Sequence, residues 1–205
     1  MTVTLALIIL NALISWQAFQ RTDILEKLKH YPYAEKRVRE WSRLITGTFV
    51  HGDWMHLAFN MYALYSFGEA LENKFIDNFG STSGRVFYLL VYLLSGLLAN
   101  LVTYHKQQDN PGFASVGASG SVSGVLFSFI IFYPLAKLLL FYIIPIPGIL
   151  AAILYLIYST YAGKKGQGNI DHTAHFWGAI SGFVLTLALK PALWNEFIEL
   201  IKQGF

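Results

Sequence analysis

The sequence contains no cysteine, and charged residues make up only 13% of its 205 positions, about half the share found in soluble domains. The absence of cysteine excludes disulfide frameworks, thiol catalysis and cysteine-based metal sites. The shortage of charge and the 55% hydrophobic content exclude a disordered chain and argue against a water-soluble enzyme. A net charge of +3 is too small and too scattered to indicate nucleic-acid binding. The composition predicts a multi-pass protein of the lipid bilayer.

Six stretches of the chain lack Asp, Glu, Lys and Arg, and a membrane-spanning helix needs about 20 mostly apolar residues. The stretches are residues 1–20, 54–68, 86–105, 110–136, 138–163 and 172–189. No basic residue precedes the first stretch and no small-residue cleavage pattern follows it, so we expect a retained helix and no secretory signal. The pattern predicts an all-α bundle of six transmembrane helices that forms a single membrane domain over residues 1–205.

Two of the six helices are expected to be shorter than their uncharged stretches. Residues 110–124 are rich in Gly and Ser, so the fourth helix should begin near Ser119. Three prolines lie between residues 134 and 147, and proline disrupts a helix interior. The fifth helix should therefore begin around Gly148, after an interfacial stretch.

Two polar segments are expected to lie at the membrane surface. Residues 21–53 hold seven of the 15 basic residues together with several aromatic ones, a mixture that suits an element in the headgroup region. Residues 190–205, with Trp194 and Phe205, resemble a short amphipathic tail at the interface.

Polar side chains inside a membrane span are costly and indicate function by default. In the second helix, His56 and Asn60 are four residues apart and share one face, which continues through Gly68 to Glu72. His51 lies five residues before His56 and need not belong to the helix. The alternative is that His56 and Asn60 only join helices by hydrogen bonds.

The start of the fourth helix carries a run of small residues from Gly117 to Gly124. Such residues often allow close helix packing, and Gly120 with Gly124 forms a small-xxx-small pair. However, a serine where a loop becomes a helix has access to free backbone N–H groups and to the positive end of the helix dipole. Ser119 therefore stands where an oxyanion could be stabilised.

The sixth helix opens with a third polar cluster. His175, Gly178 and Gly182 follow a spacing of three and four residues and share one face, where the glycines let another backbone approach. If the partner is the start of the fourth helix, His175 comes within reach of Ser119. Asp171 either orients His175 or caps the helix, and His172 lies either at the surface or beside His175.

Together the clusters supply a nucleophile, a base and hydrogen-bond donors, which are the parts of an acyl-transfer site. A transporter or channel with a polar pathway is another interpretation of the intramembrane His and Asn residues. The histidine spacings lack the His-Glu-x-x-His pattern of a metalloprotease, and we expect no metal site.

The chain also resembles the rhomboid family of intramembrane serine proteases, in the minimal six-helix form of bacterial members. The matching stretches are Arg43–Asn60 (RLITGTFVHGDWMHLAFN), Gly68–Glu72 (GEALE), Gly117–Gly120 (GASG) and Ala174–Gly182 (AHFWGAISG). The resemblance implies a Ser–His dyad of Ser119 as nucleophile and His175 as general base. It implies an oxyanion hole formed by His56, Asn60 and the Ser119 backbone N–H, and it implies no cofactor.

Further residues gain structural roles from the resemblance. Arg43 matches an arginine of the first loop, His51 a buried loop histidine, and Glu72 a glutamate that steadies the base of that loop. The implied packing glycines are Gly117, Gly120, Gly178 and Gly182. The chain departs from the family where many members have an aromatic residue four positions after the nucleophile, because it has Ser123 there.

The substrates implied by the resemblance are single-span membrane proteins, cleaved within or next to the span. A catalytically silent relative that binds client transmembrane helices is the alternative. Bacterial members imply a location in the inner membrane with the active site towards the outer face. Residues 21–53 would then lie outside, whereas their basic residues favour the cytoplasmic side by the positive-inside rule, so charge alone does not fix the orientation.

Overall fold

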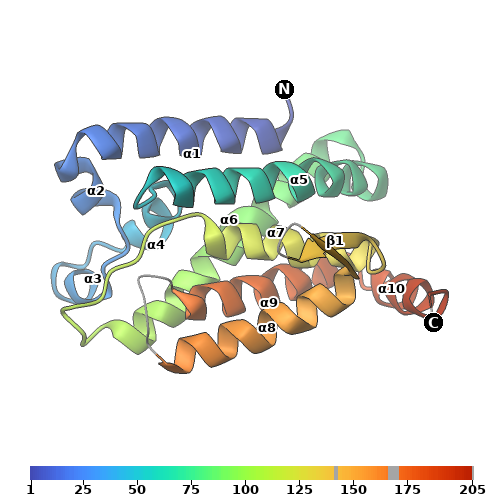
Figure 1. Cartoon of the computed structure of the whole chain (residues 1–205). Helices are drawn as coiled ribbons and strands as arrows, with labels where there is room; N and C mark the ends of the chain where they lie inside the picture. Colours follow the sequence, from blue (N-terminus) through green and yellow to red (C-terminus); the bar gives the residue numbers. More distant parts are fainter. Residues whose placement is uncertain (141–142, 166–170, 205) are drawn as a thin grey trace.

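The computed structural model describes residues 1–140, 143–165 and 171–204. These residues form a bundle of helices with one short β-hairpin (Figure 1). In chain order the elements are α1 (Val3–Gln20), α2 (Thr22–Leu28), α3 (Pro32–Val38), α4 (Arg43–Thr46), the 3-10 helix η1 (Gly47–Phe49), α5 (Trp54–Phe79), α6 (Ser81–Gln107), α7 (Ser119–Phe132), β1 (Lys137–Leu140), β2 (Ile144–Pro147), α8 (Gly148–Lys165), α9 (His172–Leu189) and α10 (Leu193–Lys202).

Each of the six uncharged stretches contains one long helix, and the fold is all-α as predicted, apart from the hairpin. The expected helix starts at Ser119 and Gly148 are confirmed. By length and hydropathy, α1 and α6 are candidate membrane spans, and the bent pair α9 and α10 is a third if it counts as one span. The described residues therefore support a membrane protein with two or three such spans, and the number six stays a prediction.

Helix α7 lies at the centre of the bundle. It packs against α5, α6 and α9, and nearly all of its residues from Gly120 to Ile131 are buried. A helix that is apolar on every side needs such a position. Its 14 residues span about 21 Å, less than the hydrocarbon thickness of about 30 Å, so α7 by itself is too short to cross the hydrocarbon region.

The other long helices surround α7. Helices α1 and α5 lie side by side along one edge of the molecule, and α8 lies at the opposite edge against α9 (Figure 1). Residues 21–53 contain the short elements α2, α3, α4 and η1. They gather at one end of the bundle, the end at which α7 and α9 begin (Figure 1).

The stretch before α8 contains a β-hairpin that we did not predict from the sequence. Strands β1 and β2 pair antiparallel, with Lys137 opposite Pro147. Leu139 and Ile144 are exposed, as suits a segment at an apolar surface. The sequence missed these strands because two prolines in β2 argue against a strand, although an edge strand tolerates them.

The C-terminal segment contains the helix α10, which is bent by 114° from α9, and its position at the membrane interface stays a prediction. It buries Leu193 and Phe197 and exposes Trp194. The predicted contribution of Phe205 lies outside the described residues.

Candidate active site

Ser119 follows a turn whose shape depends on glycine. Gly117 has a φ of +116°, a left-handed conformation that residues with a Cβ rarely adopt. A methyl group at Gly117 would also lie 2.6 Å from Cε1 and Nε2 of His56. A larger residue at this position would therefore displace either the turn or the His56 ring.

Backbone hydrogen bonds from residues 21–53 hold the segment that leads to Ser119. His30 and Ser115 form an antiparallel bridge with N···O distances of 3.0 and 2.9 Å. The N–H of Gly117 donates to the carbonyl oxygen of Gly47 at 3.0 Å. The first loop thus supports the turn before the candidate nucleophile.

His51 is completely buried and is hydrogen-bonded through both ring nitrogens. Its Nδ1 lies 2.9 Å from Oγ of Ser15, and its Nε2 accepts from the backbone N–H of Ala118 at 3.3 Å. Because Nε2 accepts, the proton of the neutral ring must lie on Nδ1, which donates to Ser15. Burial, together with the nearby His56 and against the opposing effect of Asp53, lowers the pKa of His51 to about 3. A neutral His51 therefore connects α1 to the turn before Ser119.

Arg43 ties the short helices of the first loop together. Its Nη1 donates to the carbonyl oxygens of Glu26 at 2.6 Å and Lys29 at 3.2 Å, and its Nε pairs with the Glu40 carboxylate. Because these carbonyls end α2 and cannot be satisfied within it, the arginine stabilises the bend that follows.

The candidate oxyanion donors lie at the start of α5. Asp53 caps this helix by accepting from the His56 N–H at 2.8 Å, and the His56 ring stands beside Gly117. The Asn60 side-chain nitrogen donates to the carbonyl oxygen of His56 at 3.0 Å, which leaves its second N–H for another acceptor. The predicted face of α5 is confirmed, since Asn60, Gly68 and Glu72 are all buried on it.

The backbone that approaches the glycines of the sixth helix is that of the fourth helix. A methyl group on Gly178 of α9 would lie 2.1 Å from the carbonyl oxygen of Gly120. One on Gly182 would lie 2.2 Å from that of Gly124. The backbones of α7 and α9 therefore touch one residue after Ser119 and three residues after His175.

His175 is half-buried and is surrounded by aromatic rings. The Tyr155 ring of α8 is stacked on it, with centroids 6.2 Å apart and an interplanar angle of 16°. The His172 ring meets it edge-on at 5.7 Å, so the interpretation of His172 as a surface residue is wrong. In the described parts of the chain, no hydrogen bond links the His175 ring to Ser119.

Asp171 serves as the N-cap of α9. One carboxylate oxygen accepts from the Ala174 N–H at 2.9 Å, and the other accepts from the Thr103 hydroxyl of α6 at 2.8 Å. Both bonds fix the end of α9 that carries His175. Within the described residues, Asp171 forms no hydrogen bond to the His175 ring.

Glu72 supports the bundle at the other end of α5. Its carboxylate accepts from the backbone N–H groups of Val3 and Thr4 and from the Thr4 hydroxyl, all at 2.9 Å. Arg85 lies 3.7 Å away. The glutamate thus holds the first turn of α1, which lies at the opposite end of that helix from residues 21–53. The resemblance had implied that Glu72 steadies the base of this first loop, and the structure does not place it there.

Sequence reasoning missed a buried pair in the first loop. Nδ1 of His30 lies 2.7 Å from a carboxylate oxygen of Glu35, and both side chains are fully buried. His30 also lines a small cavity together with Ser119, Asn100 and Asp171. A Glu five residues after a His is too common a spacing to have indicated the pair. Among the described residues, no three metal-ligating side chains form a cluster.

The fold and this site define the class of the protein as a mainly helical membrane protein whose polar side chains converge at the start of a short central helix. A family model described as a rhomboid domain matches residues 38–192. With most of its length matched in this way, the chain belongs to the rhomboid family.

Individual relatives agree with this assignment. The chain is 34% identical over 160 residues to Rhomboid-like protein 11, chloroplastic, of Arabidopsis thaliana, a match that covers 73% of this chain and 53% of that protein. It is 31% identical over 147 residues to Putative rhomboid protease YdcA of Bacillus subtilis (strain 168), covering 72% and 66%. It is 29% identical over 186 residues to RHOMBOID-like protein 12, mitochondrial, of Arabidopsis thaliana, covering 86% and 55%. The chain thus spans between half and two thirds of the length of these relatives.

Proposed function

We propose that the chain is an intramembrane serine endopeptidase that cleaves single-span membrane proteins within or next to their transmembrane segment. The observation that carries the proposal is the backbone contact between Gly120 and Gly178. This contact brings the first turn of α7, with Ser119, against the first turns of α9, with His175. Membership of a family known for such proteases supports the assignment.

In the proposed reaction Ser119 is the nucleophile and His175 the general base. The imidazole accepts the hydroxyl proton as Oγ attacks the scissile carbonyl, whose π electrons move to its oxygen. As the intermediate collapses, the C–N bond breaks and His175 gives the proton to the leaving amine. Water then attacks the acyl-enzyme, with His175 taking its proton and returning one to Ser119 as the ester bond breaks.

The developing negative charge would be held by several donors. The first N–H groups of a helix have no partner within it, so the Ser119 N–H is available at the start of α7. The His56 ring next to Gly117 and the second N–H of Asn60 are the proposed side-chain donors. Donors that are fixed before the reaction stabilise an oxyanion without further reorganisation.

Membership of the rhomboid family supports the proposed substrate class, single-span membrane proteins. A serine that lies within the bilayer would be reached by a substrate that is itself in the membrane, and α7 is too short to cross the hydrocarbon region by itself.

For the orientation we propose that the active site faces the outer side of a bacterial inner membrane, as in the bacterial members of the family. A reporter fused after the last residue should then be found in the cytoplasm, and a reporter outside would reverse this orientation.

The test of the proposed function is labelling of the detergent-purified protein with a fluorophosphonate probe. Parent protein should be labelled, and Ser119→Ala and His175→Ala should not, while all three show the same thermal unfolding. Labelling that persists in Ser119→Ala would contradict the mechanism.

A catalytically silent, client-binding rhomboid-like protein is the second candidate, and the lack of a hydrogen bond between Ser119 and His175 favours it. Hydrogen bonds in a catalytic site are often long before substrate binds, so this observation weighs less than the contact of α7 with α9. An unlabelled but folded parent that retains transmembrane peptides on co-purification would favour the second candidate.

A further inference from the structure

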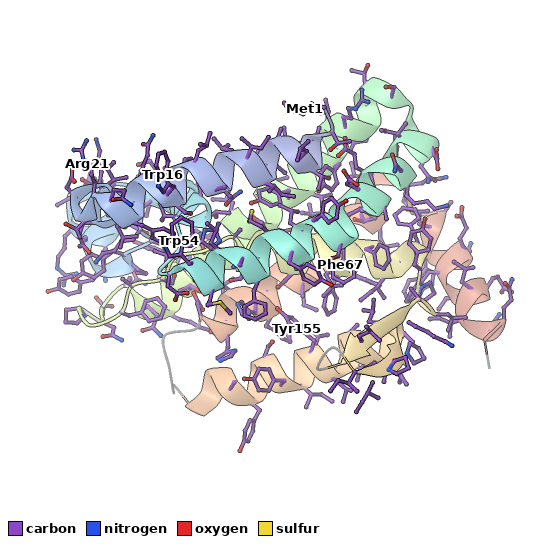
Figure 2. All side chains as sticks on the ribbon, turned by 45° about the horizontal axis from the view of Figure 1, so that its top comes forward. Met1, Trp16, Arg21, Trp54, Phe67 and Tyr155 are labelled. Carbon is purple, nitrogen blue, oxygen red and sulfur yellow. The ribbon has the colours of Figure 1, made fainter. Side chains whose placement is uncertain are left out.

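Tyr155 connects the candidate base to the central helix. It lies on α8, on the side that faces the rest of the bundle (Figure 2). Its ring is almost parallel to the His175 imidazole, with the centroids 6.2 Å apart, which is within the range of offset-stacked pairs. The tyrosine thus forms one wall of the space in which the imidazole lies.

The Tyr155 ring is itself fixed by α7. Its hydroxyl lies 2.5 Å from Oγ of Ser123, a buried side chain one turn after Ser119. Its ring also packs against Phe127, one further turn along α7, with centroids 5.8 Å apart. Tyr155 is therefore held at its hydroxyl and along its ring, and it reaches His175 from a defined position.

His175 needs such a restraint because hydrogen bonds do not fix its ring in the described structure. No hydrogen bond reaches either imidazole nitrogen there, and the remaining close ring, His172, meets it edge-on. The terminal torsion of histidine is broad and roughly two-fold. Without a wall on one side, the imidazole could turn its nitrogen away from Ser119.

We propose that Tyr155, anchored by Ser123, is a positioning residue that holds the His175 imidazole in the orientation needed to accept the Ser119 proton. The inference rests on the proposed function and adds a residue to it. A serine at position 123 is too small to touch His175, but it provides the hydroxyl that anchors a tyrosine arriving from α8. The orientation of the base then depends on α8 being packed against α7 and α9.

Tyr158 offers a matched control. It lies one turn further along α8, and its ring contacts His172 edge-on at 5.5 Å, not His175. Replacing Tyr158 therefore removes a tyrosine from the same helix and from the same ring cluster without removing the wall beside the base.

The experiment compares cleavage of a single-span substrate and the rate of fluorophosphonate labelling in five variants. We expect Tyr155→Leu to lower kcat and the labelling rate by about 10- to 100-fold, the effect of a slightly misplaced catalytic group, with KM within about twofold. Tyr155→Phe keeps the ring and should lose no more than about threefold. Ser123→Ala should lose as little activity as Tyr155→Phe. The double variant Tyr155→Phe/Ser123→Ala should lose no more activity than either single variant, because the two substitutions remove the same hydrogen bond. Tyr158→Leu should stay within about twofold of the parent.

A second measurement does not depend on activity. The Hε1 resonance of His175, assigned by its loss in His175→Ala, should move in Tyr155→Leu and stay in place in Tyr155→Phe and Tyr158→Leu. Unchanged labelling in Tyr155→Leu, or an equal loss in Tyr158→Leu, would overturn the proposal. A parent that does not label would instead contradict the proposed function, and the resonance would still show whether the Tyr155 ring lies beside the imidazole.

Discussion

The imidazole of His51 accepts a hydrogen bond from the backbone N–H of Ala118, 67 positions further along the chain. Through this bond a buried histidine of the first loop holds the residue next to Ser119. Its other nitrogen is bonded to Ser15 of α1. Three segments that are distant in sequence are therefore joined at one neutral ring, and the candidate nucleophile is positioned from the loop side.

Protonation of His51 is expected to destabilise the fold. Burial lowers its pKa to about 3, whereas histidine in an unfolded chain has a pKa of about 6.5. Below pH 6.5 the unfolded state binds a proton that the folded state does not, so this stabilising contribution is complete above about pH 6.5 and is lost progressively towards pH 3. In His51→Gln, which does not titrate, the thermal midpoint should fall less between pH 7.5 and 5 than in the parent.

The matched control for this pH dependence is His105→Gln. His105 is exposed near the end of α6, so its replacement should leave the fall of the midpoint unchanged. Identical pH dependence in the parent and in His51→Gln would show that His51 is not buried in the neutral form.

Removal of the Asn60 side chain should slow the reaction without unfolding the protein. Loss of one oxyanion donor typically lowers kcat by about 10²–10³, and we expect this loss in Asn60→Ala with KM within about threefold. Asn78→Ala is the control, because Asn78 also bonds to its own helix α5, at 2.7 Å from the Lys74 carbonyl oxygen, but at the other end. Equal activities of the two variants in substrate cleavage would remove Asn60 from the oxyanion hole.

Helix α9 should not tolerate a methyl group at Gly178. The added carbon would lie 2.1 Å from the Gly120 carbonyl oxygen, and backbone atoms cannot move aside as side chains do. Gly178→Ala should therefore lower the thermal midpoint and abolish fluorophosphonate labelling.

Gly163→Ala of α8 is the control for Gly178→Ala, since its nearest atom in another helix lies at an ordinary 3.6 Å. It should be neutral or stabilising, as expected for Gly to Ala in a helix. A Gly178→Ala protein with the parent's midpoint and labelling rate would show that α7 and α9 are not in backbone contact.

Neutralising Glu72 should loosen α1. Its carboxylate accepts three hydrogen bonds from Val3 and Thr4, and a buried donor without its charged partner costs about 1–3 kcal/mol. Glu72→Gln should lower the free energy of unfolding by about 2–3 kcal/mol, with faster hydrogen exchange at the start of α1. Glu69→Gln, which changes a less buried carboxylate on the same helix, should change neither quantity. An unaltered exchange rate in Glu72→Gln would contradict the proposed link.

Much of the site could be inferred from sequence because the residues stand in helices. The spacing from His56 to Glu72 predicts a shared face of α5, and the structure buries that face. The glycines of the sixth helix likewise predict close contact with another backbone, and the structure identifies this backbone as the start of the fourth helix, where Gly120 meets Gly178. In a helix, the spacing between two residues determines whether their side chains lie on the same face. These inferences therefore required no knowledge of the whole fold.

Other features could not be inferred in this way. Tyr155 has no motif around it, and only the packing of α8 against α7 and α9 brings its ring to His175. The hydrogen bonds of Glu72 to the first turn of α1 join residues that are 68 and 69 positions apart. Helical spacing does not indicate contacts between residues of different helices. The assignment of Glu72 to the base of the first loop failed for that reason.

The sequence by itself determined that this is a helical membrane protein, where the helices that carry Ser119 and His175 begin, and that these two residues are candidates. These properties follow from local composition and period, which act within one helix. Only the tertiary structure decided that residues 21–53 support the turn before Ser119 and that Tyr155 stands beside His175. Those contacts depend on how separate helices pack. Packing requires two complementary surfaces, and the sequence of one segment describes only one of them.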